Sequence, residues 1–224
     1  MKKYLLLVAM TIVTSVMSFA QLEEGHIAYD IEMSSEDPDM AMAVMMFSGS
    51  TMDLYFANDM ARTDLSFGSL MSMTTVMNSA TEEVLILMGG MMGDKAVLTN
   101  SEEMELDEEE VEDPTVTLTK EKKEILGYKC KKAIITDADG NEMDYWYTEE
   151  IKTISTDSKS TISKLPGLAL EYSVDREGMM MSFTAKKVKT SLDEATKESK
   201  LSMEIPDGYE EMTYEEFTSM GGGM

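Results

Sequence analysis

The sequence predicts a mainly β protein built on a strongly curved antiparallel sheet, with few short helices. Apolar and polar side chains alternate along many short segments, which is the period of a strand and not of a helix. Turn residues such as Ser48-Gly49-Ser50 separate these segments at short intervals. A sheet of about ten strands has to curl, split or close, and we expect strong curvature.

The first half of the chain contains the clearest alternation. In Gly25 to Met33, Ile27, Tyr29 and Ile31 share one face. Met40 to Phe47 is apolar on both faces, which we expect of a strand that is covered on both sides. The further strands expected in this half are 52–57 and 60–66, paired around a turn at Asn58-Asp59, then 84–88 and 94–99; residues 69–78 are ambiguous.

The second half resumes the strand pattern. Tyr145-Trp146-Tyr147 lies in a segment rich in residues that favour strands. Asp137 to Asn141 has the composition of a hairpin turn. Only Tyr214 to Met220 suggests a short helix. The strands expected in this half are 115–120, 127–135, 142–151, 169–174 and 179–189.

Alternation also predicts which side chains face the inside of the curved sheet. We expect the inward face to hold Ile27, Tyr29, Ile31, Leu85, Leu87, Tyr128, Cys130 and Trp146. In a regular strand, side chains alternate between the two faces, so Ala133 and Ile135 would lie on the opposite face from Tyr128 and Cys130. A β-bulge near Lys131 would bring both pairs to the same side.

The N-terminus has the three parts of a cleaved export signal. Lys2 and Lys3 are basic, Tyr4 to Met17 is apolar, and Ser18-Phe19-Ala20 is a small-x-small cleavage site. We therefore expect residues 1–20 to be a signal peptide and residues 21–224 to form a single β-rich domain. No later stretch is long and apolar enough to span a membrane. The expected location is periplasmic or extracellular.

Acidic residues dominate the charge of the chain. Asp and Glu number 43 against 19 Lys and Arg, which gives a formal net charge of −24. Nucleic acids and anionic lipid headgroups both require a basic surface, so neither is an expected partner. The acids are densest from Glu102 to Asp113, and like charges cannot pack together. We expect an acidic, solvated and mobile loop at 101–113.

The residues that usually carry catalysis or bind metals are scarce. The chain holds one His and one Cys. His26 lies on the polar face of the first strand, and Cys130 is expected to behave as a buried small hydrophobe. Asp137-x-Asp139-x-Asn141 begins like a calcium loop, but Glu142 replaces the required Gly and Thr148 the closing Glu. We expect no catalytic residue, no metal, no cofactor and no enzymatic activity.

The 25 Met are the strongest anomaly in the composition. Met is an adaptable apolar filler, which suits core packing and also suits cavities for varied apolar ligands. Thioethers also bind Cu(I), so copper buffering is a third interpretation. If a cavity exists, the expected lining is Ile27, Tyr29, Ile31, Met42, Met46, Leu85, Leu87, Trp146, Met179 and Met181.

Several landmarks of the second half occur in a familiar order. They are Gly127-Tyr128-Lys129-Cys130-Lys131-Lys132-Ala133, Tyr145-Trp146-Tyr147-Thr148-Glu149-Glu150-Ile151, Leu165-Pro166-Gly167-Leu168 and Pro206-Asp207-Gly208-Tyr209. In this order the chain resembles a family of exported bacterial proteins of unknown function, related to the family named for its Gly-Leu-Pro-Gly-Leu-Ile motif. Lys164 and Ala169 stand where that motif has its first Gly and its Ile. The resemblance implies the half-barrel fold of the lipoprotein carriers LolA and LolB, and an apolar-ligand cavity.

These observations predict an exported protein that binds an apolar ligand, such as a lipid or an acyl chain, without catalysis. An open half-barrel lined by Met and aliphatic side chains provides the cavity. Two alternatives stay open. One is a structural or adhesive envelope protein whose acidic surface contacts an envelope protein partner, and the other is a copper buffer.

Overall fold

The computed structural model describes residues 23–219, except 69, 92, 107–113, 138–139, 152–164 and 177. The predicted signal peptide at 1–20 lies outside the described residues. The described strands form one 12-stranded sheet in the order β12-β6-β5-β4-β3-β2-β1-β11-β10-β9-β8-β7. All neighbouring strands are antiparallel except β12 and β6, which are parallel.

The strands agree with the expected segments in most places. Those of the first half are β1 (Glu24–Ser34), β2 (Ser50–Ala57), β3 (Met60–Phe67), β4 (Met71–Asn78), β5 (Glu83–Gly90) and β6 (Lys95–Asn100). Those of the second half are β7 (Thr115–Ile125), β8 (Tyr128–Thr136), β9 (Glu142–Thr148), β10 (Leu168–Arg176), β11 (Met179–Lys189) and β12 (Glu210–Met212). The ambiguous segment 69–78 thus contains strand β4, and the expected hairpin at Asn58-Asp59 is confirmed.

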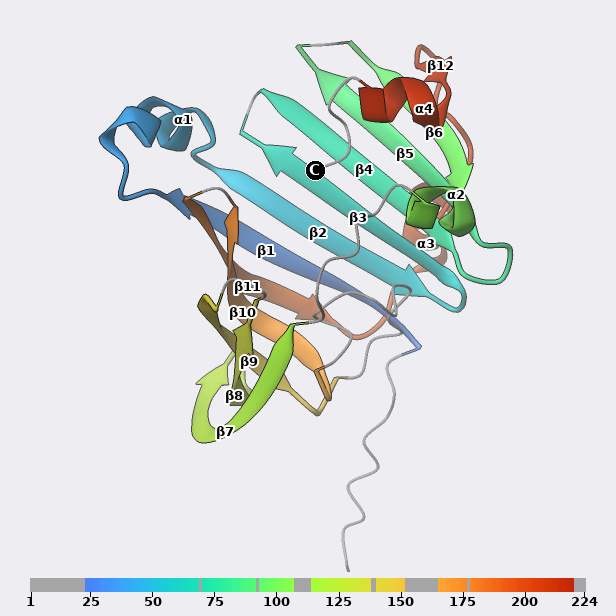
Figure 1. The fold of residues 1–224 in the computed structure, drawn as a ribbon. Helices are drawn as coiled ribbons and strands as arrows, with labels where there is room; N and C mark the ends of the chain where they lie inside the picture. The colour runs from blue at the N-terminus through green and yellow to red at the C-terminus, as the bar shows by residue number, and fades with distance from the viewer. Residues whose placement is uncertain are drawn as a thin grey trace, which may run out of the picture.

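Two meanders make up the sheet. Strands β1 to β6 follow one another along the chain, and β7 to β11 do the same. The last strand of the second meander, β11, pairs with the first strand of the first, β1. Figure 1 shows β1 to β6 as one broad layer, from which β11 to β7 bend away at the lower left. The prediction of a mainly β, curved and open antiparallel sheet is therefore confirmed.

The segment expected as a strand at Met40 to Phe47 is helical instead. It forms the short 3-10 helix η1 (Pro38–Met40) and helix α1 (Ala41–Met46). Asp37 caps η1 by accepting a hydrogen bond from the Asp39 amide. Ala and Met favour helices, and the run is exposed, with Met42 71% and Met45 73% accessible. An apolar run therefore does not mark a buried strand here.

Three further helices are short. They are α2 (Ser101–Leu106), α3 (Glu194–Lys200) and α4 (Tyr214–Phe217). The helix expected near residue 214 is confirmed, with a capping box formed by Thr213 and Glu216. Helix α2 corrects the prediction of an acidic loop at 101–113 for its first six residues, and residues 107–113 lie outside the described part. Helix α3 is absent from the predicted elements, because its sequence is almost entirely polar.

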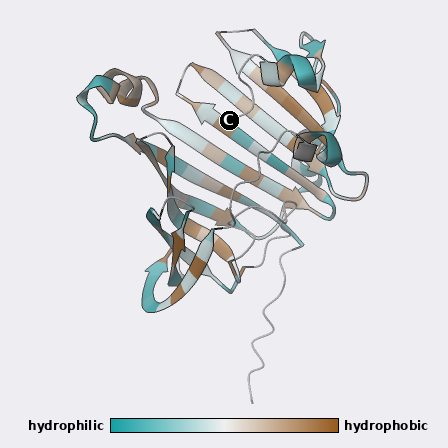
Figure 2. Ribbon diagram, viewed as in Figure 1, coloured by the Kyte–Doolittle hydropathy of each residue, from teal (hydrophilic) through white to brown (hydrophobic). Residues whose placement is uncertain are grey.

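The C-terminal segment covers both faces of β4 to β6. On one face, called here the α4 face, Tyr214 and Phe217 pack on Val84, Ile86 and Val97. On the opposite face, called the α3 face, the coil after α3 packs on the sheet. The coil contributes three side chains, which are Met203, Ile205 and Tyr209. They pack on a buried group of the sheet, formed by Val76, Leu85, Leu87 and Ala96. Figure 2 shows the hydrophobic residues concentrated on β5 and β6 beneath α4.

Leu85 and Leu87 do not lie on the predicted inward face, because β5 is covered on both sides. Ile27 pairs with Leu54, and the row continues through Thr63 and Thr75 to Ile86. Cross-strand partners share a face, so Ile86 lies with Ile27 on the α4 face, and Leu85 and Leu87 point to the α3 face. A strand that is buried on both sides has no polar alternation, so its sequence does not reveal its parity.

An aromatic cluster fills the inside of the bend. Tyr172 stacks between Tyr145 and Phe183, with ring centroids 5.2 and 4.6 Å away. Phe183 pairs with Ile31, so this cluster continues the α4 face. The Tyr29 hydroxyl donates a 2.8 Å hydrogen bond to the Ala169 carbonyl. Burial raises the pKa of Tyr145 to about 12, which keeps its hydroxyl neutral.

Trp146 lies on the other side of the sheet from this cluster, contrary to the prediction. Tyr145 and Tyr147 are its buried neighbours, whereas Trp146 is half-buried. The Lys123 ammonium covers its ring at 4.3 Å from the centroid. In the β8–β9 register Tyr128 and Cys130 have the same parity as Trp146, so they too leave the predicted inward face.

The expected bulge near Lys131 falls in the neighbouring strand. Pairing of β8 with β9 is regular, and the register shift lies in β7, between Leu118 and Lys122. Cys130 is nevertheless buried, as predicted. Burial raises the pKa of its thiol to about 11, so Cys130 is a protonated and poorly reactive side chain.

Gly167 provides a stability test. A Cβ at this position would lie 2.0 Å from the Thr148 carbonyl oxygen, which belongs to the backbone at the end of β9 and cannot move aside like a flexible side chain. We expect Gly167→Ala to lower the free energy of unfolding by about 3 kcal/mol or more. Urea unfolding, followed by the fluorescence of the single Trp, measures this.

Gly178→Ala is the matched control. Gly178 has a φ of +80° and nothing within 4 Å of an added Cβ, so only its backbone conformation opposes the substitution. Its expected cost is about 1 kcal/mol. If the two substitutions lower the free energy of unfolding equally, the structure accommodates the close approach to Thr148 at little cost in stability, which would contradict this prediction.

Candidate functional site

The α4 face carries a continuous apolar row across five strands. Tyr29 pairs with Met52, and the row continues through Leu65 and Met73 to Met88. Tyr29 is buried, whereas the other four side chains are half-buried. A ligand on the open sheet would meet this row, of which only Tyr29 belongs to the predicted lining.

The predicted lining residues divide between several places. Ile27, Tyr29, Ile31, Met179 and Met181 lie on the α4 face, and Met181 pairs with Met33 beside Ile31. Met42 and Met46 lie on helix α1, while Leu85, Leu87 and Trp146 point to the opposite side. The structure adds Met52, Leu65, Met73 and Met88, which sequence reasoning did not assign to the lining. The alternation of Leu65 with Asp64 and Ser66 is a signal that could have placed it there.

A polar site occupies the α3 face at the junction of the two meanders. His26 of β1 lies between Tyr55 of β2 and Lys189 of β11, its partners in the sheet register. Its ring stacks on Tyr55 with centroids 4.3 Å apart and planes 2° from parallel. Its Nε2 lies 2.5 Å from Asp53 Oδ1. An ionised carboxylate only accepts hydrogen bonds, so Nε2 carries the proton.

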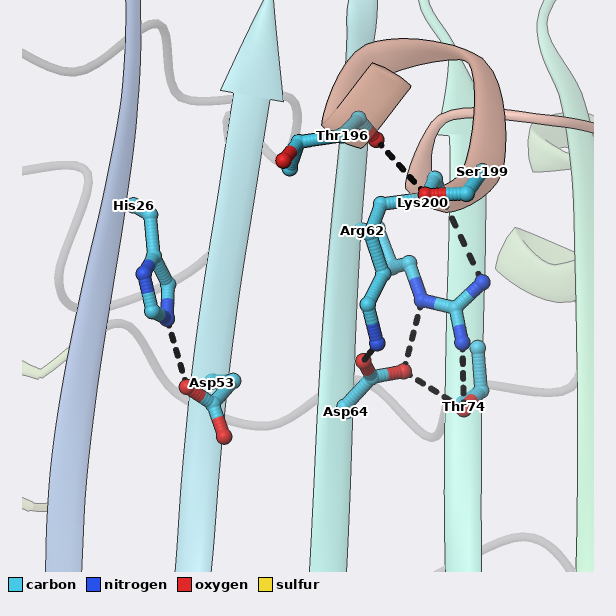
Figure 3. A network of polar contacts seen from close by, with 8 residues as sticks. All are labelled: His26, Asp53, Arg62, Asp64, Thr74, Thr196, Ser199 and Lys200. Atoms are coloured by element: carbon cyan, nitrogen blue, oxygen red, sulfur yellow. Dashed lines mark hydrogen bonds and ion pairs between the residues drawn. The ribbon is translucent and has the colours of Figure 1, made fainter. Parts of the chain in front are cut away.

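Asp64 is the centre of the neighbouring contacts, which Figure 3 shows beside the His26–Asp53 pair. Its carboxylate accepts from Arg62 Nε at 2.6 Å, from Thr74 Oγ1 at 2.7 Å and from Lys200 Nζ at 3.1 Å. Burial alone would raise the pKa of Asp64. The hydrogen bonds from Thr74, Arg62 and Lys200, with the charge of Arg62, outweigh burial and hold that pKa below its usual value.

Helix α3 is capped at its first turn and is held on the sheet by residues of β1 to β3. Asp193 caps its first turn by accepting from the Thr196 amide at 2.8 Å, and Arg62 Nη1 donates to the Lys200 carbonyl at 3.3 Å. Glu24 of β1 forms an ion pair with Lys197 at 2.6 Å. The Lys200 ammonium also lies 5.1 Å from the Tyr55 ring centroid. The position of α3 therefore depends on strands β1 to β3.

A small cavity of about 180 Å³ lies between α3 and the sheet. Its floor is His26 and Tyr55. The rest of its lining is Lys189, Ser191, Leu192, Asp193, Thr196, Ser199 and Lys200. Sequence reasoning placed His26 on a polar face but did not find this site, because the α3 residues lie far away in the chain and carry no motif.

Two other kinds of site are absent from the described residues. Between residues 23 and 219, with the gaps given above, no three or more His, Cys, Asp or Glu side chains group in a way that would hold a metal ion. In the same ranges no helix has both the length and the hydropathy to cross a membrane.

The fold and the match of its sequence define the class of the protein. Residues 70–216 match the family described as the N-glycanase peptide, N-terminal domain. The match takes in more than half of the chain, so the chain belongs to this family. The expected relationship to the Gly-Leu-Pro-Gly-Leu-Ile family is not confirmed. No curated protein sequence matches the chain.

Solved structures resemble the chain only distantly. Two crystal forms of PNGF-II share 18% and 17% sequence identity with it, with TM-scores of 0.47 and 0.46. Each similarity covers 88% of this chain but only 33% and 32% of PNGF-II, so the chain spans about a third of that protein.

Two other solved structures are similar over most of their own length. An uncharacterized conserved protein from Thermus thermophilus has 11% identity and a TM-score of 0.49, over 85% of this chain and 90% of that one. A LolA superfamily protein from Nitrosomonas europaea has 10% identity and a TM-score of 0.20, over 78% and 90%. Similarities this low carry no functional argument, and they leave the expected likeness to lipoprotein carriers as a prediction.

Asp64 is the residue to test in the polar site. Because its pKa is lowered in the folded protein, its stabilising effect is complete above the usual carboxyl pKa and is lost as the pH falls through the lowered value. We expect Asp64→Asn to lower the free energy of unfolding by about 1–3 kcal/mol at neutral pH. The difference from wild type should shrink in strongly acidic solution.

Asp59→Asn is the matched control, because Asp59 is an exposed residue at the turn that precedes the same strand. Urea unfolding at neutral and acidic pH compares the two variants with wild type. A loss in Asp64→Asn that persists unchanged at low pH would contradict the role given to its charge.

Proposed function

We propose that the protein is a non-catalytic binding domain that holds an apolar ligand, such as an acyl chain, against the α4 face. The observation that carries the proposal is the row from Tyr29 through Met52, Leu65 and Met73 to Met88. Four of its five members are half-buried, so their apolar surface remains partly available to a ligand.

The chemistry of this row supports an acyl chain over a more polar ligand. Unbranched Met side chains adapt to varied apolar shapes. The neighbouring row on the same face runs from Ile27 through Leu54, Thr63 and Thr75 to Ile86, so it is also uncharged and mostly apolar. No charged side chain stands in the row, so orientation by fixed polar groups is weak. We therefore propose broad specificity, with affinity set by the length of the buried chain.

The location of the protein belongs to the same proposal. The basic, apolar and small-x-small parts of residues 1–20 support export to the periplasm or the exterior. A ligand from the envelope, such as a lipid, would be available there. Mass spectrometry of lipid extracted from the purified protein tests whether such a ligand is carried from the cell.

Family membership favours a second candidate function. The matching family is described as an N-terminal domain of an N-glycanase peptide. We propose, as the alternative, that the domain assists a glycanase by contacting its substrate or its catalytic part. Calorimetry with an N-glycopeptide and with the free peptide distinguishes this role from acyl binding. Titration of the protein with Cu(I) tests the remaining alternative, copper buffering.

Fatty acids of increasing length test the leading proposal. Each buried methylene contributes about 0.8 kcal/mol, so each added carbon should tighten the dissociation constant about fourfold until the face is filled. The net charge of −24 disfavours an anionic headgroup, and added salt should relieve that penalty. Displacement of a fluorescent fatty acid, measured at low and high salt, gives both dependences.

Substitutions on the two faces supply the controls. Met52→Glu places a charge in the apolar row and should weaken binding by at least about tenfold. Met73→Gln is a second, uncharged variant in the same row. Leu98→Glu changes an exposed side chain on the α3 face and should bind as wild type does. Affinity that is independent of chain length, or equal in all variants, would contradict the proposal.

A screen for activity tests the non-catalytic part. Purified protein is incubated with esters, peptides, glycans and glycopeptides, and we expect no turnover above that of a denatured sample. His26 and Cys130 are the side chains most suited by type to take part in catalysis. Any positive result is therefore repeated with His26→Ala and Cys130→Ala. A robust activity that disappears in either variant would overturn the proposal.

A further inference from the structure

The cavity under α3 brings cationic groups together in a strongly acidic protein. Lys189 lies beside His26 in the β1–β11 register, and Lys200 approaches from the end of α3. Both lysines line the cavity, as do the hydroxyl-bearing residues Ser191, Thr196 and Ser199. Ammonium and hydroxyl groups are donors to oxyanions, and the lysine ammonium offers three hydrogens.

The carboxylates around the cavity already have partners within the described part of the chain. Asp53 faces His26 Nε2, Asp64 accepts from Arg62, Thr74 and Lys200, and Asp193 caps α3. Hydrogen bonds from Thr196, with the nearby charge of Lys189, hold the pKa of Asp193 below its usual value. All three carboxylates therefore already have a hydrogen-bonding partner, and the lowered pKa values of Asp64 and Asp193 keep these two ionised.

Two groups at the cavity are left without such a partner. Among the described residues, no carboxylate lies within ion-pair distance of Lys189, and no group bonds to Nδ1 of His26. No buried side-chain nitrogen of those residues lacks a hydrogen bond, so Nδ1 is reached by solvent. With Nε2 turned to Asp53, Nδ1 is free to accept from a hydroxyl of a ligand.

We propose that this cavity binds a small oxyanion, such as a phosphate or a carboxylate group, between the ammonium groups of Lys189 and Lys200. Its volume of about 180 Å³ is below the roughly 300–1,000 Å³ of pockets for drug-sized ligands. The ligand is therefore a free inorganic anion or the acidic group of a small hydroxylated molecule. This site lies on the opposite face from the apolar row and does not depend on the proposed function.

His26 makes the site directly observable, because it is the only imidazole in the chain. Untagged protein is titrated with sodium phosphate, sodium glucuronate and glucose at fixed pH, with sodium chloride at matched ionic strength. Proton–carbon NMR spectra follow the His26 ring. We expect a saturable shift with phosphate or glucuronate and none with glucose or chloride. Tighter binding of phosphate identifies a free inorganic anion, and tighter binding of glucuronate identifies an acidic, hydroxylated ligand.

Two charge-matched variants locate the anion. Lys189→Gln should weaken binding by about tenfold, because it removes one of the two charged donors. Lys187→Gln removes the same charge two residues earlier on the strand, at a residue that does not line the cavity, and should bind as wild type does. An equal shift with chloride or glucose, no saturable shift, or unchanged binding by Lys189→Gln would overturn the proposal.

Discussion

The pairing of β1 with β11 is the interaction on which the rest of the structure depends. It joins two meanders that would otherwise be separate sheets, and its register places residues that are far apart in the chain beside one another. Strands β12 and β7 are the two edges of the joined sheet, so the sheet is open, and it bends at this junction. The shift between Ala28 and Tyr29 lies in this pairing, where a bulge increases the local twist. The buried hydrogen bond from Tyr29 to Ala169 extends the connection to β10.

Both candidate sites border this junction, on opposite faces. On the α4 face, Ile31 contacts the stacked aromatic side chains of the bend through its partner Phe183, and Tyr29 begins the apolar row. On the α3 face, the same strand contributes His26 to the cavity. Because successive side chains of a strand point in opposite directions, one strand serves an apolar surface and a polar one without mixing them. The two surfaces are thus held at fixed positions relative to each other by a single strand.

Alternation of apolar and polar residues predicted which face of the sheet a side chain occupies. It did not predict features that depend on which other segments of the chain pack or pair there. Ile27, Tyr29 and Ile31 alternate with polar residues, so their common face was predictable. Leu85 and Leu87 belong to a continuous apolar run, and only the covering segments on both sides explain why that run needs no polar face. Helix α1 is apolar and exposed, which no burial pattern anticipates. The polar site was not predictable, since it requires the pairing of His26 with Lys189 and the docking of a helix without a motif.

The route of the last described residues has a consequence for the order of folding. After α3 the chain covers one face of β4 to β6, pairs along the free edge of β6 as β12, and then covers the other face with α4. Strands β5 and β6 therefore lack both of their covers until residues 194–217 have been synthesised. A nascent chain that ends earlier exposes two apolar surfaces and an unpaired strand edge, which is the condition under which chains associate with one another. The completion of this domain is thus tied to its final segment, and a chaperone would be needed most just before that segment emerges.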